Sequence, residues 1–352
     1  MKSGWTDRSW KWIAVVAAAL AVASTACAPV DTGPTEEAAP VVEEAPGAAG
    51  VEGVRRIPVT TPSGTFEVWT RKLGDHPTIK VLLLHGGPGM THEYVELVGQ
   101  LLSEAGIEAY LYDQLGSYYS DQPDDTELWR IPRFVDEVEQ VRQALGLGPE
   151  NFYLWGHSWG GLLAIEYALA HGDALKGLVI SNMMASIPEY NRYAQEVLIP
   201  QIDPQVMAEI EALESAEDYE NPRYMELLME HHYAHHVLRK PVDEWPEKVL
   251  ASLEHVNPDI YVLMQGPSEL GASGRIEHWD RTADLAKIET PTLVIGARHD
   301  TMDPAHMEWM ANELPKGEYL FCPDAAHVAH HDDTEIYMEG LIRFLEAVDA
   351  ND

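Results

Sequence analysis

A serine set between glycines is the clearest chemical signal in the sequence. The pentapeptide GHSWG at 156–160 fits the pattern G-x-S-x-G and lies between a strand-like run at 151–155 and a helix-like run at 161–170. In this pattern a sharp turn from strand to helix exposes the serine hydroxyl, and the glycines let neighbouring chain pass close to the turn. The pattern therefore predicts Ser158 as a nucleophile, although the five residues alone also suit an ordinary glycine-rich turn.

A second glycine-rich segment is typical of a site that stabilises the negative charge formed when such a serine attacks a carbonyl. HGGPG at 85–89 directly follows a strand-like run at 79–84. A developing alkoxide needs fixed N–H donors, and losing one typically costs about 10²–10³ in rate. We expect the backbone N–H groups of Gly87 and Trp159 to form this oxyanion hole, and Gly86 to contact the substrate. Taken alone, HGGPG also suits a tight turn.

The order of residues along the chain predicts where an acid and a base should lie. After a serine of this kind, an acidic residue and then a histidine are expected, each following a late strand. The strand-like run at 292–295 leads to Asp300, and the run at 318–322 leads to His327. We expect His327 to take the serine proton and give it to the leaving group, while Asp300 orients the imidazole.

Neighbouring residues leave alternatives for both roles. Asp303 is a second candidate for the acid, and His330 and His331 are further candidates for the base. If His327 is the base, we expect the other two histidines to lie at the surface.

Length and composition limit what kind of protein can carry these residues. The chain has 352 residues, 45% of them hydrophobic, which is enough for a substantial core. Its formal net charge of -35 repels phosphate backbones, so nucleic acid is excluded as a partner. Two cysteines exclude a disulfide framework and a cysteine-rich zinc module. We expect no cofactor and no metal.

Strand-like and helix-like segments alternate from residue 54 onward, which predicts an α/β protein with a mostly parallel central sheet. Several of the strands are continuous apolar runs, as expected where helices cover both faces of a sheet. Residues 188–279 break the alternation and hold helical patches, which predicts a helical cap inserted into a core formed by 54–187 and 280–352. The strand-like runs are 66–70, 79–84, 108–112, 151–155, 177–181, 292–295 and 318–322; core helices are expected at 133–145, 161–170 and 335–348, and cap helices at 207–213, 224–238 and 244–253.

The first 27 residues have the features of an export signal. Basic residues precede an apolar run at 13–23, and small residues ending in Cys27 follow it. This arrangement resembles a bacterial lipobox with Ser24 at a position that usually holds Leu, so we expect Cys27 to be lipidated. A plain cleaved signal or an uncleaved anchor are the alternatives. In each case we expect the protein to be exported. A lipidated Cys27 would anchor it to the cell membrane or envelope, and a plain cleaved signal would leave it periplasmic or secreted. The acidic, Ala- and Pro-rich segment 28–53 is expected to be a disordered linker.

Several motifs together carry a resemblance to a known family. These are HGGPGM at 85–90, YDQLG at 112–116, the serine pentapeptide, GPSE at 266–269 and the late Asp and His. Combined, they resemble the proline iminopeptidase family of α/β-hydrolases over residues 54–348. Two segments of the predicted cap, DYENP at 218–222 and EWP at 244–246, resemble the tricorn-interacting aminopeptidase branch.

The resemblance implies an enzyme that removes N-terminal residues, often proline, from peptides without a metal. It also implies that Glu269, in GPSE, binds the free ammonium group of the substrate. A second family glutamate follows the triad acid, but Thr301 occupies that position here, with Asp303 as a possible replacement. This departure favours a broader activity on small N-terminal residues or amino-acid amides. Tyr118 stands where the family has Gly, and either narrows the pocket or points outward.

Two other functions remain open at this stage. One is a serine esterase, lactonase or amidase that ignores the substrate amine, and the other is a catalytically silent envelope protein that uses the fold for binding. The histidine-rich segment 231–236 offers pairs at metal-binding spacing, but packing within the cap is the simpler interpretation because no carboxylate or cysteine completes a known motif.

Overall fold

The computed structural model describes residues 51–351. The predicted export segment at 1–27, with Cys27, and the predicted linker as far as residue 50 lie outside the described residues. Among the residues that are described, no helix is long and apolar enough to cross a membrane.

A mixed sheet of eight strands forms the centre of the fold, in the order β1-β2-β4-β3-β5-β6-β7-β8. The pairs β1–β2 and β2–β4 are antiparallel, and the pairs from β4 through β8 are parallel. This is the sheet of an α/β-hydrolase, as predicted. The strands are β1 (Val54–Thr61), β2 (Gly64–Leu73), β3 (Lys80–Leu84), β4 (Glu108–Asp113), β5 (Phe152–His157), β6 (Gly177–Ser181), β7 (Thr292–Ala297) and β8 (Gly317–Cys322).

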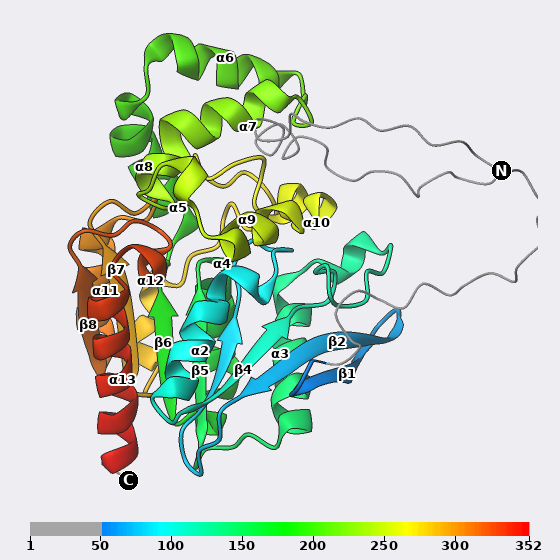
Figure 1. Cartoon of the computed structure of the whole chain (residues 1–352), viewed down its shortest axis with the longest axis vertical. Helices are drawn as coiled ribbons and strands as arrows, with labels where there is room; N and C mark the ends of the chain where they lie inside the picture. The colour runs from blue at the N-terminus through cyan, green and yellow to red at the C-terminus, as the bar shows by residue number, and fades with distance from the viewer. Residues whose placement is uncertain (1–50, 352) are drawn as a thin grey trace, which may run out of the picture.

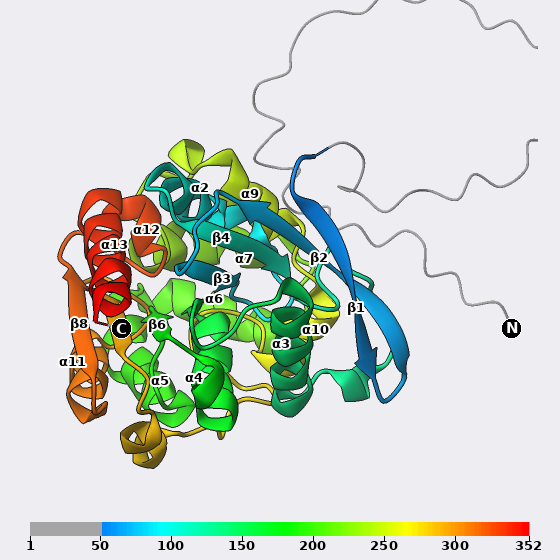
Figure 2. The same ribbon diagram turned by 90° about the horizontal axis from the view of Figure 1, so that it is seen from below.

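Helices cover both faces of this sheet, as Figure 2 shows from below. Helices α2 and α13 pack on one face, and α3, α4 and α11 pack on the other. Residues 81–84 of β3 are all apolar because both of their faces are covered: Val81 and Leu83 pack on the side of α2 and α13, and Leu82 and Leu84 pack on the side of α3, α4 and α11. All four are fully buried. The helices are α2 (Glu96–Glu104), α3 (Ile131–Leu145), α4 (Trp159–His171), α11 (Pro304–Glu313), α12 (Ala329–Asp332) and α13 (Thr334–Ala350).

Strand β1 is absent from the predicted elements. It pairs only with β2, so it forms an edge of the sheet, where Pro58 is tolerated because it removes no ladder hydrogen bond toward a second neighbour. Ile57 and Val59 are fully buried on its inner face. The proline and the two preceding arginines are more typical of a loop, and pairing with β2 is what makes this segment a strand.

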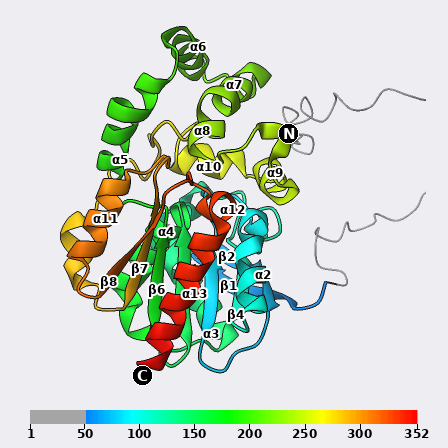
Figure 3. The ribbon, with the colours of Figure 1, turned by 60° about the vertical axis from the view of Figure 1, so that its left-hand side comes forward.

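Between β6 and β7 the chain forms a series of helices that lie over the carboxyl ends of the parallel strands (Figure 1, Figure 3). An isolated bridge between Ser186 and Asp280 joins the beginning and the end of this segment. Helices α5 and α10, which are short, were not among the predicted ones. The helices are α5 (Ile187–Tyr193), α6 (Pro204–Ser215), α7 (Pro222–Leu228), α8 (Ala234–His236), α9 (Glu247–Glu254) and α10 (Pro258–Met264).

The carboxyl ends of the parallel strands carry the polar residues singled out in the sequence. Loops at this edge are where open α/β sheets bind their ligands. The residues that follow β3, β5, β6, β7 and β8 include, in that order, His85, Ser158, Asn182, Asp300 and His327.

Candidate active site

Ser158 lies in a strained turn between β5 and α4. Its φ of 55° and ψ of -126° are rare for a residue with a side chain. A Cβ atom on Gly156 would lie 2.0 Å from the carbonyl oxygen of Gly160, and one on Gly160 would lie 2.2 Å from that of Leu84. Glycine is therefore required at both positions, and the turn is pressed against the end of β3.

The loop after β3 passes directly beside this serine. A Cβ on Gly86 would lie 3.0 Å from the Cβ of Ser158. The N–H of Gly86 donates to the hydroxyl oxygen of Tyr94 at 2.7 Å, so it is not free to contact an oxyanion. Gly87 has a φ of 112°, and within residues 51–351 the backbone N–H groups of Gly87 and Trp159 have no hydrogen-bond acceptor.

Gln114, from the YDQLG motif, connects this loop to the start of α4, the helix that follows the serine turn. Its backbone N–H donates to Nε2 of His85 at 3.1 Å, and its side-chain amide donates to the His85 carbonyl oxygen at 3.1 Å. Its side-chain oxygen accepts from the indole N–H of Trp159 at 2.8 Å. Because Nε2 of His85 accepts, Nδ1 carries the proton and donates to Gly86 O at 2.9 Å. Burial lowers the pKa of His85, which keeps this ring neutral.

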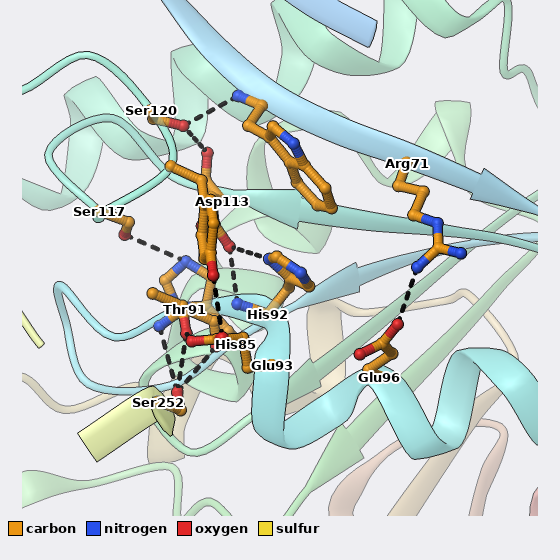
Figure 4. Close-up of polar contacts among 12 residues, drawn as sticks. Arg71, His85, Thr91, His92, Glu93, Glu96, Asp113, Ser117, Ser120 and Ser252 are labelled. Carbon is orange, nitrogen blue, oxygen red and sulfur yellow. Dashed lines mark hydrogen bonds and ion pairs between the residues drawn. The ribbon is translucent and has the colours of Figure 1, made fainter. Parts of the chain in front are cut away.

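Buried polar side chains also anchor the turn that follows the loop (Figure 4). Asp113 accepts from the backbone N–H of His92 at 2.6 Å and contacts its Nδ1 at 2.8 Å. Thr91 and Tyr119 donate to Glu93, whose carboxylate also lies 2.6 Å from Nδ1 of His255 in the segment after α9. The contact between Glu93 and His255 ties the segment after α9 to the turn that follows the loop after β3.

Tyr94 and His157 connect the loop after β3 to the loop that carries His327. The Tyr94 hydroxyl accepts from Gly86 and donates to Nδ1 of His157 at 2.9 Å, because the other ring nitrogen of His157 faces a carbonyl oxygen and must carry the ring proton. The Nε2–H of His157 then donates to the backbone carbonyl of His327 at 2.8 Å. Burial holds the pKa of His157 well below its ordinary value, so the ring carries this single proton.

Asp300 and His327 form a buried pair beside this turn. The Nδ1 atom of His327 lies 2.7 Å from Oδ1 of Asp300, and the His327 ring centroid lies 4.8 Å from that of His157. Burial lowers the pKa of His327, but the charge and hydrogen bond of Asp300 and the charge of Glu269 raise it, and the net shift is upward. The pairing leaves Nε2 as the nitrogen available for proton transfer.

The other candidates for acid and base have different partners. Asp303 caps α11 by accepting from the N–H of Ala305 at 2.9 Å. His330 and His331 both contact the carbonyl oxygen of Tyr94, at 3.0 and 2.8 Å. The expectation that these two histidines lie at the surface was wrong: His330 is fully buried and His331 is half-buried, because α12 packs beneath the turn that contains Tyr94.

Glu269 lies half-buried among tyrosines rather than on the open surface. Its Oε1 accepts from the hydroxyl of Tyr261 at 2.5 Å. Its backbone carbonyl accepts from Tyr190 at 2.9 Å and lies 3.1 Å from Nε2 of His232, and its N–H donates to Tyr233 at 3.3 Å. The charge of this carboxylate also raises the pKa of His327.

Two departures from the family pattern find their explanation here. Thr301 is fully buried, and its hydroxyl lies 3.2 Å from Nδ1 of His327, so it faces the Asp300–His327 pair. Tyr118 is 37% exposed and stacks on the ring of His255 at 3.9 Å, so it points outward. Neither residue adds a charge near Glu269. Asp303, the possible replacement for the second family glutamate, instead caps the start of α11.

The histidine-rich segment 231–236 packs within the helices above the sheet. His232 contacts Glu269, and Nδ1 of His236 lies 2.9 Å from the carbonyl oxygen of His299. Across residues 51–351, no group of three or more His, Cys, Asp or Glu side chains is placed to hold a metal ion.

Comparison with known proteins agrees with this geometry. The α/β hydrolase fold family matches residues 80–334. A proline iminopeptidase from Elizabethkingia meningoseptica is 56% identical over 296 residues, covering 84% of this chain and 98% of the relative. One from Flavobacterium johnsoniae is 54% identical over 296 residues, with the same coverage of 84% and 98%. The chain belongs to the proline iminopeptidase family of α/β-hydrolases.

A solved structure within this family supports the same conclusion. The crystal structure of the proline iminopeptidase from Mycobacterium smegmatis superimposes with a TM-score of 0.74 at 29% identity, covering 85% of this chain and 100% of that one. The structure of VinJ gives a TM-score of 0.77 at 30% identity, covering 84% of this chain and 99% of that one. The resemblance read from the motifs is thereby confirmed.

Several residues that support this iminopeptidase-family site were not among those predicted from the sequence. No sequence pattern indicates the contacts of Tyr94, and the G-x-S-x-G pattern leaves the position of His157 unspecified. Asn182 had a detectable signal, because it is a polar residue directly after a buried parallel strand. The tyrosines around Glu269 come from separate cap helices, and no spacing rule connects them.

Replacing Gly160 by alanine tests whether the serine turn and the loop after β3 are in rigid contact. The added Cβ would lie 2.2 Å from Leu84 O and 2.8 Å from His85 O, so backbone must move. We expect Gly160→Ala to lower kcat/KM by about 10²-fold, the effect of a displacement near 1 Å in an active site. Steady-state kinetics and the Tm measured by circular dichroism check this.

Gly172→Ala, at the other end of α4, is the matched control, because its Cβ would meet only Thr290 Oγ1 at 3.7 Å. Gly160→Ala with the same kcat/KM as this control would contradict the close approach.

Proposed function

We propose that this protein releases N-terminal proline from peptides through an acyl-enzyme formed on Ser158. The observation that carries the proposal is the half-buried Glu269 carboxylate, which Tyr261 holds and whose charge raises the pKa of His327. Relatives at 54–56% identity are named proline iminopeptidases. An exopeptidase must recognise a free amine, and a carboxylate does so through a charge-assisted hydrogen bond.

The first half of the reaction forms the acyl-enzyme. The Oγ of Ser158 bonds to the carbonyl carbon of the N-terminal residue, and its proton passes to Nε2 of His327. The carbonyl oxygen becomes an oxyanion, which the N–H groups of Gly87 and Trp159 stabilise. The C–N bond then breaks, and the leaving amine takes the proton from His327. Asp300 stays ionised and stabilises the transient imidazolium.

The second half uses water in place of the peptide. His327 takes a proton from the water as its oxygen bonds to the acyl carbon, and the same N–H groups hold the new oxyanion. The bond to Ser158 then breaks, and Oγ regains a proton from His327. The free amino acid leaves with its carboxylate newly formed.

The role of Glu269 is to bind the substrate's secondary ammonium. A proline at the N-terminus carries a positive charge on the ring nitrogen, close to the carbonyl that reacts. Tyr261 already fills one lone pair of the carboxylate, so the remaining lone pairs are available to the ligand. Thr301, which stands in place of a second family glutamate, is neutral, so Glu269 would be the single carboxylate that binds the amine.

Replacing Glu269 by glutamine tests amine recognition. Glutamine keeps an oxygen for Tyr261 but removes the charge. We expect Glu269→Gln to lower kcat/KM for prolyl p-nitroanilide by about 10- to 150-fold, the loss of one hydrogen bond to a charged group. The much slower hydrolysis of N-acetylprolyl p-nitroanilide should change by less than about 2-fold, because an acetylated nitrogen has no charge to bind.

Glu254→Gln, an exposed acid at the end of α9, is the matched control and should leave both substrates unchanged. An equal loss on free and acetylated substrates would contradict amine recognition by Glu269. Extending the free substrates to Ala, Leu and Phe measures how narrowly the site prefers proline.

We also propose that the protein is exported and attached to the membrane by a lipid on Cys27. The basic residues, the apolar run at 13–23 and the small residues before Cys27 support this. The acidic segment 28–53 would then act as the tether between the lipid and the enzyme. Mass spectrometry of the mature N-terminus tests the proposal: a lipid-modified Cys27 is expected, and a free Ala28 would contradict it.

A further inference from the structure

Asn182 has a backbone conformation that only a few residues share. Within residues 51–351 the residues other than glycine with positive φ are Ser158, Asn182 and Glu217. Asn182 directly follows β6, has a φ of 51° and is fully buried. Such conformations cost energy and persist where the surrounding structure holds them, which is frequent at functional sites.

The side chain of Asn182 reaches the acid of the candidate active site. Its Nδ2 donates to Oδ2 of Asp300 at 2.6 Å. The other carboxylate oxygen, Oδ1, accepts from the backbone N–H of Met302 at 3.1 Å and pairs with His327. Asn182 therefore fixes the rotation of the carboxylate about its Cβ–Cγ bond, because it engages the oxygen that His327 does not use.

A chain of buried hydrogen bonds holds Asn182 in the orientation that donates. The indole N–H of Trp155 can only donate, and it donates to Tyr337 Oη at 3.0 Å. The Tyr337 hydroxyl lies 2.7 Å from Ser181 Oγ, and the Ser181 hydroxyl donates to Oδ1 of Asn182 at 2.8 Å. Ser181 must therefore accept from Tyr337. The carboxylate oxygen of Asp300 accepts, so the Asn182 amide turns its Nδ2 toward Asp300 and its oxygen toward Ser181, and every proton in the chain points toward Asp300.

We propose that Asn182 is a positioning residue that holds Asp300 in place and, through Asp300, sets the basicity of His327. The inference rests on the proposed function of Asp300 and His327. The amide N–H places the positive end of a dipole against the carboxylate and partly offsets its charge. Removing that dipole while Met302 and Thr301 still hold Oδ1 makes the surroundings of His327 more negative and favours the imidazolium.

The variant Asn182→Gly tests this without adding strain, since glycine adopts positive φ freely. His327 must be neutral to accept a proton, and its pKa is raised in the free protein, so the acid limb of the wild-type kcat/KM profile should lie above about pH 6.5. In Asn182→Gly we expect that limb to move to still higher pH. At its pH optimum kcat should fall by about 10- to 100-fold, as for other partners that orient an active-site ligand. KM should stay within about 2-fold.

Two controls separate positioning from a general loss of structure. Glu217→Gly relieves the same positive φ at an exposed turn after α6, and should leave the profile unchanged. Ser181→Ala removes the hydroxyl that orients the amide, and should move the acid limb in the same direction by less. A fall in kcat with an unmoved acid limb and a lower Tm in Asn182→Gly would overturn the proposal, as would wild-type kinetics.

Measuring each variant on prolyl p-nitroanilide and on p-nitrophenyl acetate keeps this inference distinct from the proposed function. The acetate ester needs the acid, base and nucleophile but no amine recognition. A wild-type protein that cleaves only the ester would contradict the aminopeptidase function, and the Asn182 effect on ester hydrolysis would still decide the inference. If Asn182→Gly hydrolyses the ester with the wild-type pH profile, Asn182 does not position Asp300.

Discussion

The contact between the serine turn and the end of β3 is the constraint on which the rest of the site depends. Gly160 leaves no room for a side chain against the carbonyl oxygen of Leu84, and Gly86 leaves none against Ser158. The nucleophile and the N–H groups proposed for the oxyanion are therefore brought together by backbone packing between two parallel strands. Side chains at the same edge of the sheet then contact a serine turn whose position the backbone already fixes.

Contact with a carboxylate decides which of four buried histidines near Ser158, namely His85, His157, His327 and His330, can take up a proton. Burial lowers the pKa of His85, His157 and His330, and each of these rings is hydrogen-bonded to backbone or to a neutral group. His327 differs because a carboxylate contacts it, and there the net shift in pKa is upward. A cluster of buried imidazoles thus has one member suited to proton transfer, and the others serve as fixed hydrogen-bonding groups.

Much of this arrangement was predictable from sequence because the motifs lie next to recognisable strands. The continuous apolar run at β3 and the order of Ser158, Asp300 and His327 predicted an α/β-hydrolase sheet and the positions of the polar loops. Strand β1 was missed because Pro58 is acceptable only at an edge, which the sequence does not reveal. The predicted exposure of His330 was wrong because its burial depends on a contact with Tyr94, which lies 236 residues earlier in the chain. The bounds 188–279 for the cap stay a prediction.

The supporting residues were hidden for a common physical reason. Tyr94, His157 and Asn182 act through hydrogen bonds between loops that are distant in sequence, and such contacts impose no periodicity or spacing. The tyrosines around Glu269 likewise come together only when the cap helices fold over the sheet. Long-range polar contacts of this kind are visible only once the packing is known, although a polar residue after a buried parallel strand is a useful signal.

We propose that the strained turn makes Ser158 the one activated nucleophile of this site. Treating the full-length protein with a fluorophosphonate and locating the adduct by peptide mass spectrometry tests it most directly. The account predicts one adduct per chain, on Ser158, forming far more slowly in His327→Ala. An adduct on another residue, or no adduct on folded wild-type protein, would contradict it.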